Sequence, residues 1–231
     1  MSSVTSEQTT TDPAKAPQER VSAAVRREQI LAAASQVFGE RGYIGATTDQ
    51  VAQAAGISQP YVVRMFGSKE NLFVEVLGRA LQKLLDAFRA ALARSEEAGD
   101  DLEARMTRLG AAYADLIVDR GILMSLMQGF VAGHEPAIGA KSRAGIMELY
   151  TLLRNEAGFE PDLIVDFLAH GMLFNTLIAM RMLEQYDSDD ACIPELLAHT
   201  FRTKLDVVMN VVVGQPDAAS AAEAIRARTT A

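Results

Sequence analysis

The sequence has little of the material from which catalytic, redox and metal sites are built. It contains one cysteine, Cys192, and therefore forms no internal disulfide. None of the three histidines, His134, His170 and His199, stands at a metal-ligand spacing from a carboxylate or cysteine. The chain also lacks a glycine-rich phosphate loop and a nucleophile elbow. These absences predict a protein that is not an enzyme and that uses no cofactor and no metal.

Long apolar runs are also missing. The nearest approach to a membrane span, residues 163–180, is interrupted by Asp166, His170 and Asn175, so we do not expect a transmembrane helix. Residues 1–20 are rich in Ser, Thr, Gln and Pro without an apolar core, which excludes a secretory signal and indicates a disordered arm. The single Cys192 fits a reducing cytoplasm, where we expect a small buried hydrophobe rather than a redox sensor.

What the chain does have is helical periodicity, and no segment reads as a convincing strand. With 231 residues and 49% apolar content, it is predicted to be an all-α globular protein. Glycine and proline signals divide the part after residue 68 into six helices, predicted at roughly 69–95, 101–119, 121–132, 136–157, 161–185 and 192–213. Residues 214–231 are predicted to form a loose tail.

The segment from Thr48 to Phe66 predicts two short helices joined by a sharp turn. Val51, Ala52 and Ala55 form one apolar edge, and Val62, Met65 and Phe66 form the other. Gly56 can take the positive φ that closes the first helix, Ser58 is predicted to cap the second, and Pro60 fits its first turn. The pattern is typical of a helix-turn-helix, although an ordinary αα-hairpin has the same features.

The flanking residues extend this unit. An apolar stripe from Ile30 to Phe38 predicts a preceding helix that ends at Gly42, and Thr47 is predicted to cap the next one. Ser68 then caps a long helix that begins almost directly after the second short helix. Three helices and the start of a fourth would form a compact domain over residues 21–70.

Residues 26–73 as a whole resemble the amino-terminal domain of the TetR (tetracycline repressor) family. The resemblance is carried by Ile30, Phe38, Gly42-Tyr43, Thr47, Val51-Ala52, Ala55-Gly56-Ile57-Ser58, Phe66, Ser68-Lys69-Glu70 and Leu72. It implies an amino-terminal helix-turn-helix DNA-binding domain followed by a helical ligand-binding and dimerisation domain, here residues 71–213. It also implies a homodimer that binds a double-stranded DNA operator and a small-molecule effector.

The second short helix departs from the usual family pattern. Pro60, Tyr61, Val62 and Val63 stand where members usually carry Gly, Thr, an aliphatic residue and Tyr, so the phosphate contacts of that Thr and Tyr are not transferable. The Tyr61 hydroxyl can replace one of them. Arg64 can pair with guanine or hold a phosphate, while a glutamine at this exposed end can read adenine and an apolar side chain can touch a thymine methyl. The residues predicted to contact DNA are Thr47, Thr48, Ser58, Gln59, Pro60, Tyr61, Val63, Arg64 and Lys69.

Charge is distributed unevenly along the chain. The net charge of −8 argues against DNA binding by the whole surface, but residues 20–70 hold six basic and four acidic residues, a net charge of +2. Residues 71–231 carry −8. We therefore expect the amino-terminal domain to face DNA and the acidic remainder to be held away from it, which lowers non-specific binding.

The last helices are too apolar for the surface of a monomer. Residues 163–182 carry large apolar groups on nearly every face, and a second stripe includes Phe201, Leu205, Val208 and Met209. The resemblance implies that these helices pair with their copies in a four-helix bundle; alternatively, they form the centre of one subunit.

Methionines, aromatics and a few polar residues of the middle helices suit an adaptable apolar pocket, although such residues also form ordinary cores. The predicted ligand-binding residues are Met106, Tyr113, Met124, Met127, Gln128, Phe130, Met147, Tyr150, His170, Phe174 and Asn175. His170 stands one turn from Asp166, so this pair can also be a satisfied hydrogen bond.

The sequence thus predicts a cytoplasmic, homodimeric, TetR-like transcriptional regulator, a repressor that binds a palindromic operator and is released by a small, largely apolar effector. The alternative is a protein of the same fold that binds DNA or a protein partner without a small effector.

Overall fold

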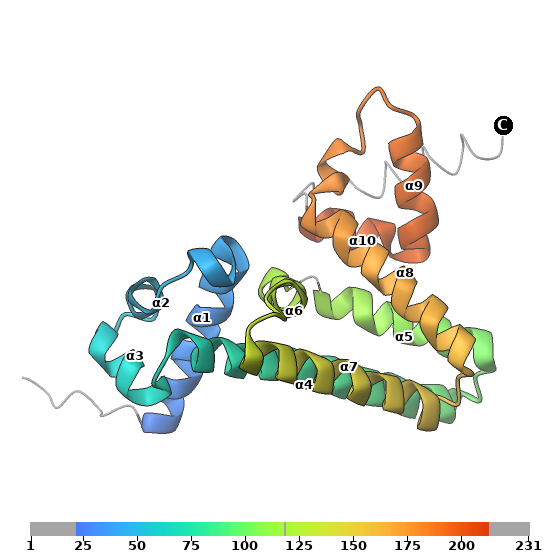
Figure 1. The fold of residues 1–231 in the computed structure, drawn as a ribbon. Coiled ribbons are helices and arrows are strands. Elements are labelled where there is room, and N and C mark those ends of the chain that lie inside the picture. Colours follow the sequence, from blue (N-terminus) through green and yellow to red (C-terminus); the bar gives the residue numbers. More distant parts are fainter. Residues whose placement is uncertain (1–21, 118, 213–231) are drawn as a thin grey trace, which may run out of the picture.

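The computed structural model describes residues 22–117 and 119–212, which fold into helices and connecting turns without a strand. The predicted arm, 1–20, and tail, 214–231, lie outside these residues. Figure 1 shows two regions, with α1, α2 and α3 at one end and the remaining helices extending away from them along α4. The first region comprises α1 (Ala23–Gly45), α2 (Thr48–Ala54) and α3 (Gln59–Phe66).

The second region is built on the long helix α4. Its elements are α4 (Lys69–Ala98), α5 (Leu102–Ile117), α6 (Arg120–Val131), α7 (Pro136–Asn155), α8 (Pro161–Ala179), η1 (Met182–Gln185), α9 (Cys192–Phe201), η2 (Arg202–Lys204) and α10 (Leu205–Val212). Helix α7 lies beside α4, α6 lies between α1 and these two helices, and α8 crosses over α5 (Figure 1). Because α6 packs against both α1 and α4, it joins the two regions.

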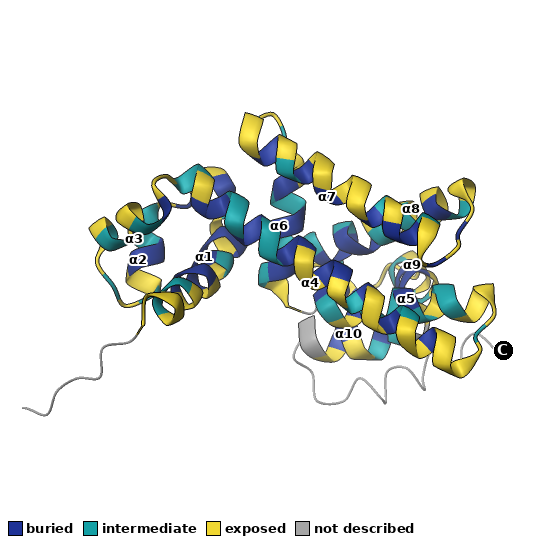
Figure 2. Cartoon of the chain, turned by 90° about the horizontal axis from the view of Figure 1, so that it is seen from below, coloured by how far each residue is buried: buried dark blue, intermediate teal, exposed yellow. Residues whose placement is uncertain are grey.

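The amino-terminal region has its own apolar centre, which continues into α4. The ring of Phe73 lies 5.0 Å from that of Phe38 and 5.1 Å from that of Tyr43, in edge-to-face and tilted arrangements. Ala52 is buried, as its lack of bulk predicts for the point where the short helices cross. Figure 2 shows that the buried faces of α1, α4 and α6 meet one another. The amino-terminal region therefore packs on α4 and α6, two helices that also form part of the second region.

A second apolar cluster holds the carboxy-terminal helices. Phe174 of α8 packs against Phe201 of α9 in a tilted arrangement, with ring centroids 4.2 Å apart. Val208 and Met209 are buried in the same cluster within one chain. The expectation that this stripe lies between two copies is therefore wrong for these two residues, and the alternative of a subunit core holds for them.

Two of the predicted helices end earlier than expected. The helix predicted to reach residue 185 ends at Ala179, where Arg181 takes a left-handed φ of 58° and a short 3₁₀ turn follows. The helix predicted over 192–213 is broken at Arg202, with φ 47° and ψ −124°. Cys192, expected to be buried, is exposed. The helix predicted to end at Gly42 continues to Gly45 across a kink at that glycine, whose φ is 69°.

Candidate functional site

The turn between α2 and α3 follows from its capping residues. The Thr47 hydroxyl accepts a hydrogen bond from the Gln50 N–H (3.2 Å), and the Gln50 side chain accepts one from the Thr47 N–H (3.1 Å), which forms a capping box. Gly56 takes a φ of 64° between the helices, as predicted. Ser58 stands at the N-cap of α3, but its side chain makes no capping hydrogen bond, so its exposed hydroxyl is available to another partner.

One face of α3 is open to solvent. Pro60, Val63 and Arg64 are exposed, while Val62 and Phe66 are buried against the rest of the domain, which is the division that the helical periodicity predicts. The guanidinium of Arg64 lies 4.9 Å from the centroid of the Tyr61 ring, a cation–π contact that orients the side chain. This face therefore presents the Arg64 guanidinium, the Val63 side chain and the Ser58 hydroxyl to solvent.

Two predicted DNA-contacting residues are held by partners within the domain. The Gln59 amide donates to the Thr48 hydroxyl (3.2 Å), which ties the start of α3 to the start of α2. The Lys69 ammonium donates to the carbonyl oxygens of Tyr43 (2.9 Å) and Ile44 (3.3 Å) and lies 4.6 Å from the centroid of the Tyr43 ring. Lys69 therefore fastens the end of α1 to the start of α4, a position in which it orients the domain.

A cavity of about 470 Å³ lies in the second region, between α4, α5, α6, α7, α8 and η2. Its volume is in the range of small-molecule sites, and its walls are predominantly apolar. Six of the predicted ligand-binding residues line it: Met106, Tyr113, Phe130, His170, Phe174 and Asn175. The sequence did not indicate other residues that line it, among them Leu81, Leu84, Phe88, Gly110, Arg202 and Lys204.

The other five predicted ligand-binding residues lie elsewhere. Met147 is 58% exposed on α7, Met124 lies beside Gly39 of α1, and Met127 and Tyr150 pack against the two apolar clusters. Gln128 points to the amino-terminal domain. Helical spacing placed all five on plausible apolar faces, but it could not show which neighbour each face meets.

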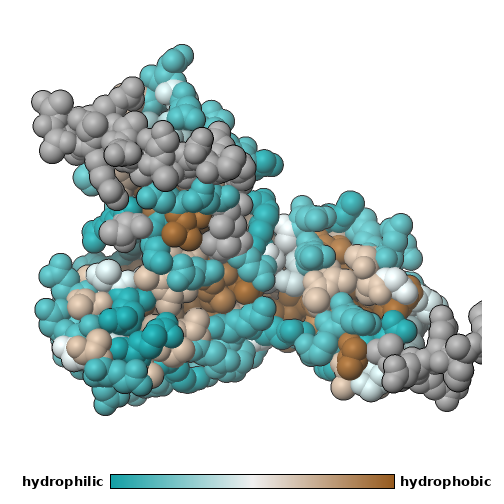
Figure 3. Space-filling view, turned by 180° about the vertical axis from the view of Figure 1, so that it is seen from behind, coloured by the Kyte–Doolittle hydropathy of each residue, from teal (hydrophilic) through white to brown (hydrophobic). Residues whose placement is uncertain are grey.

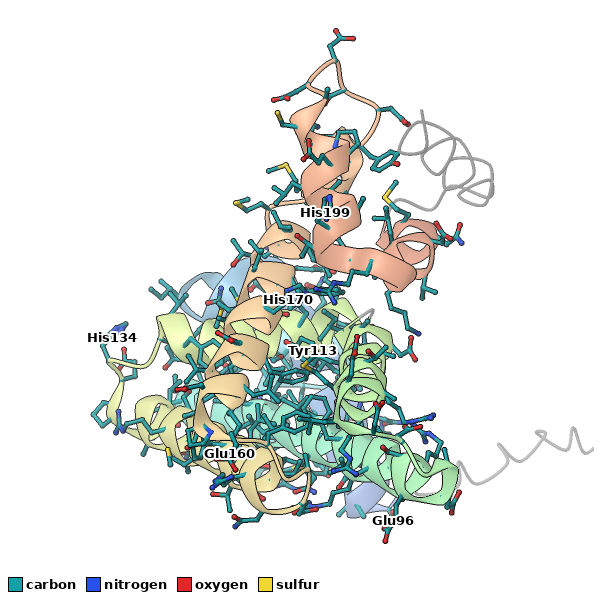
Figure 4. The ribbon with its side chains drawn as sticks, turned by 90° about the vertical axis from the view of Figure 1, so that its right-hand side faces the viewer. Glu96, Tyr113, His134, Glu160, His170 and His199 are labelled. Atoms are coloured by element: carbon teal, nitrogen blue, oxygen red, sulfur yellow. The ribbon has the colours of Figure 1, made fainter. Side chains whose placement is uncertain are left out.

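The polar groups of the cavity are largely satisfied by one another. The Tyr113 hydroxyl donates to the Asn175 side-chain oxygen at 2.7 Å. Loss of solvent raises the pKa of Tyr113 to about 12, against the opposite effect of this hydrogen bond, so the phenol stays neutral. His170 Nε2 donates to the Thr200 carbonyl (3.0 Å) rather than to Asp166, which links α8 to α9. Figure 4 shows His170 and Tyr113 near each other, on α8 and α5.

A contact between the two regions was not predicted. The Gln128 side-chain oxygen accepts a hydrogen bond from the Tyr43 N–H at 3.2 Å. The glycine before it, Gly42, is kinked with a φ of 69°, and a Cβ added there would meet the Gln128 amide at 3.3 Å. On the same helix, Leu126 and Phe130 line the cavity. Helix α6 therefore touches the cavity on one side and the end of α1 on the other.

Comparison with known proteins agrees with this architecture. The family model described as bacterial regulatory proteins, tetR family, matches residues 30–76. The chain is 31% identical over 141 residues to the HTH-type transcriptional activator FasR of Mycolicibacterium smegmatis, covering 58% of this chain and 62% of FasR. It is 31% identical over 132 residues to the HTH-type transcriptional regulator BetI of Stenotrophomonas maltophilia, covering 56% of this chain and 65% of BetI. Each match thus spans less than two thirds of the relative.

The fold is shared over a greater length. The structure of the fatty acid degradation regulator FadR from Bacillus halodurans covers 86% of this chain and 99% of its own, with a TM-score of 0.55 and 18% identity. Fold and site together define a two-region helical protein with an amino-terminal helix-turn-helix. Its amino-terminal helix-turn-helix domain is that of the TetR family of bacterial regulatory proteins, whose model matches residues 30–76.

Proposed function

We propose that this protein is a cytoplasmic transcriptional regulator that binds a palindromic DNA operator as a homodimer. The observation that carries this proposal is the exposed face of α3, on which Pro60, Val63 and Arg64 project from the second helix of a helix-turn-helix. In this arrangement Arg64, oriented by the Tyr61 ring, contacts a base edge or a phosphate in the major groove, and Ser58 contacts the backbone. Lys69 and Gln59 hold the helices in register.

The charge distribution supports this orientation on DNA. The domain that carries α3 has a net positive charge, whereas residues 71–231 carry −8. Repulsion between the acidic region and phosphates favours the approach of α3 and disfavours every other approach. Affinity for arbitrary DNA is then low relative to affinity for the operator.

The homodimer is proposed to form through the outer face of α8. This helix is long and apolar enough to cross a membrane by length and composition, yet only 28% of its most apolar window is buried. Val165 and Leu173 are exposed along it, and Met180 is exposed just past its end. A second copy docked on the outer face of α8 would remove these side chains from water and place two copies of α3 on one duplex. Figure 3, seen from behind, shows a further apolar area between the carboxy-terminal helices and those beneath them.

The cavity is proposed to bind a small, largely apolar effector that releases the operator. A molecule that displaces Phe130 moves α6, and with it the Gln128 contact to Tyr43. Leu84 and Phe88 of α4 also line the cavity, so a second helix carries the displacement to Lys69 and the end of α1. Release then follows because the two copies of α3 no longer fit half-sites about 34 to 36 Å apart.

Repression is the proposed sign of regulation, because an effector that releases DNA from a repressor restores transcription directly. The relative FasR is named an activator, so activation with the same reading head is the alternative. A reporter gene placed behind the protein's operator tests this. Repression predicts that reporter output rises when the gene for this protein is removed, and activation predicts that it falls.

A second alternative keeps DNA binding and dispenses with the effector. The size and apolar walls of the cavity favour an effector. A library of apolar molecules screened by thermal shift tests it, since any molecule that prefers the folded state raises the melting temperature. The effector proposal fails if nothing stabilises the protein, or if every stabilising molecule leaves operator affinity unchanged.

A further inference from the structure

The cavity has walls of two chemical kinds. Those contributed by α4, α6 and α7 carry only apolar side chains and one glycine. All the charged lining side chains come from α8 and η2: Asp166, Arg202 and Lys204. The cations exceed the anion by one, and both lie within one short 3₁₀ turn. A bound molecule therefore meets an apolar environment on one side and charged side chains on the other, where Lys204 is already paired with Asp115 and Arg202 has no ionic partner among the described residues.

Arg202 is held in an unfavourable backbone conformation at this place. Its φ of 47° and ψ of −124° lie outside the regions that non-glycine residues prefer. Its guanidinium is exposed and has no ion pair or hydrogen bond within residues 22–117 and 119–212. Lys204, by contrast, donates to Asp115 of α5 at 3.0 Å, which anchors the turn. The strained turn thus lines the cavity with two cationic residues, of which Lys204 is paired with Asp115 and Arg202 is not paired among the described residues.

Gly110 keeps the cavity open. It lies in the middle of α5 and lines the cavity, and a Cβ added there would meet no atom within 4 Å. Glycine in the interior of a helix makes the helix less stable than alanine would. At Gly110 no neighbouring atom lies close enough to require the absence of a side chain. The volume that a side chain would occupy is therefore left for a ligand.

Polar side chains in the interior of the cavity already have hydrogen-bond partners. Tyr113 and Asn175 are paired with each other, and His170 is paired with Thr200. An apolar ligand portion can lie there without leaving a buried polar group unsatisfied. A guanidinium at the charged side recognises a carboxylate through two parallel hydrogen bonds.

We propose that the effector is a fatty carboxylate, with its aliphatic chain between α4, α6 and α7 and its carboxylate on Arg202 and Lys204. This inference rests on the proposed effector cavity and specifies the chemical class of its ligand. It predicts that both parts of the molecule are required. A short carboxylate lacks the chain, and a neutral or cationic alkyl compound lacks the partner for Arg202.

The test is calorimetric titration of the full-length protein with a matched series of probes below their micellar concentrations. Octanoate, decanoate and dodecanoate should bind with affinity rising roughly threefold to fourfold per added methylene. 1-Decanol should bind at least about tenfold more weakly than decanoate, and decyltrimethylammonium more weakly still. Arg202→Gln, and Arg202→Gly, which also relieves the strain, should each weaken decanoate about tenfold and leave 1-decanol unchanged.

Arg181→Gln is the matched control, because Arg181 is also an exposed arginine with positive φ, and it does not line the cavity. Gly110→Phe should abolish binding of every probe while the protein remains folded. If 1-decanol and decanoate bind equally to the cavity and the Arg202 variants change neither, the carboxylate class is wrong and the effector cavity stands. If no probe binds, or if Gly110→Phe does not alter binding, the cavity assignment fails as well.

Discussion

The Gln128 side chain accepts a hydrogen bond from the backbone N–H of Tyr43 at 3.2 Å, across 85 positions of sequence. This contact joins the middle of α6, whose other side lines the cavity, to the kinked end of α1. The Tyr43 carbonyl accepts from Lys69 at the start of α4. The Tyr43 peptide groups are therefore held from both helices through which an effector is proposed to act.

Gln128→Leu should uncouple the cavity from the reading head. The Tyr43 N–H loses its acceptor, so we expect destabilisation of about 1 to 3 kcal/mol and a smaller effect of decanoate on operator affinity. If decanoate weakens operator binding by the wild-type dimer a hundredfold, the coupling free energy is about 2.7 kcal/mol. The variant should retain less than half of this coupling free energy. Fluorescence anisotropy with labelled operator measures both affinities.

Two further variants control this experiment. Gln128→Glu keeps an oxygen acceptor and should preserve the coupling, whereas Gln82→Leu removes an exposed glutamine that donates to Asp86 on the same helix and should change nothing. A full response to decanoate in Gln128→Leu would show that α6 does not carry the signal through this contact.

Arg64→Ala should weaken operator binding by about 1 to 3 kcal/mol and relax sequence preference at one symmetric pair of positions. The reason is that Arg64 is the cation on the exposed face of α3, oriented by Tyr61. Titration against operator and scrambled duplexes measures the change in affinity. Arg94→Ala, which changes an exposed arginine of α4, is the control. Equal weakening on both duplexes would assign Arg64 to a phosphate instead of a base.

Leu173→Arg should produce monomers, because Leu173 is 41% exposed on the apolar face of α8 and would place a charge in the proposed interface. Val131→Arg changes a residue that is 69% exposed on α6 and should remain dimeric. Val208 is fully buried within the subunit, so Val208→Arg should unfold it rather than dissociate it. Sedimentation velocity and circular dichroism separate these outcomes; a dimeric Leu173→Arg would move the interface to another surface.

Tyr113→Phe should destabilise the fold by about 1 to 3 kcal/mol, because the Asn175 carbonyl, 4% exposed as a residue, loses its donor. The raised pKa of Tyr113, about 12, means that folding favours the neutral phenol. The contribution of the neutral Tyr113 phenol to folding stability is complete below the pKa of the unfolded state, near 10. It is lost as the pH rises through the pKa of the folded state, about 12. Urea unfolding from pH 8 to pH 11 measures this.

For the Tyr113 experiment, Tyr150→Phe is the matched control, since the Tyr150 hydroxyl makes no hydrogen bond within the described part of the chain. It should change stability by less than about 0.5 kcal/mol. If both variants lose stability equally, the Tyr113–Asn175 pair is not specifically stabilising.

The amino-terminal fold was predictable because nearby capping and turn residues determine where its helices begin and end. Thr47, Gly56 and Pro60 act within a few residues, and each acts as predicted, whereas Ser58 stands at the predicted N-cap without a side-chain capping hydrogen bond. The ends of α8 and α9 were not predictable in this way. At each end an arginine takes a positive φ, Arg181 in the left-handed helical region and Arg202 outside it, and no glycine in the sequence marks either position.

The site was predictable as a set of helix faces but not as a set of contacts. Six of eleven predicted residues line the cavity because apolar periodicity marks inward faces. It cannot distinguish the cavity from the neighbouring core, so Met127 was included and Leu84 was missed. Gln128 was predicted to contact a ligand and Lys69 to contact DNA, because their side chains are of the types that make such contacts. In the structure, both bind backbone groups that are distant in sequence.

The most direct test of the account is the affinity of the wild-type dimer for a palindromic duplex selected from random DNA, measured against a scrambled duplex at physiological salt. We predict one dimer per palindrome, an affinity at least about a thousandfold above that for scrambled DNA, and a specific loss with Arg64→Ala. Equal affinity for both duplexes, unchanged by Arg64→Ala, would contradict the proposal that the exposed face of α3 reads DNA.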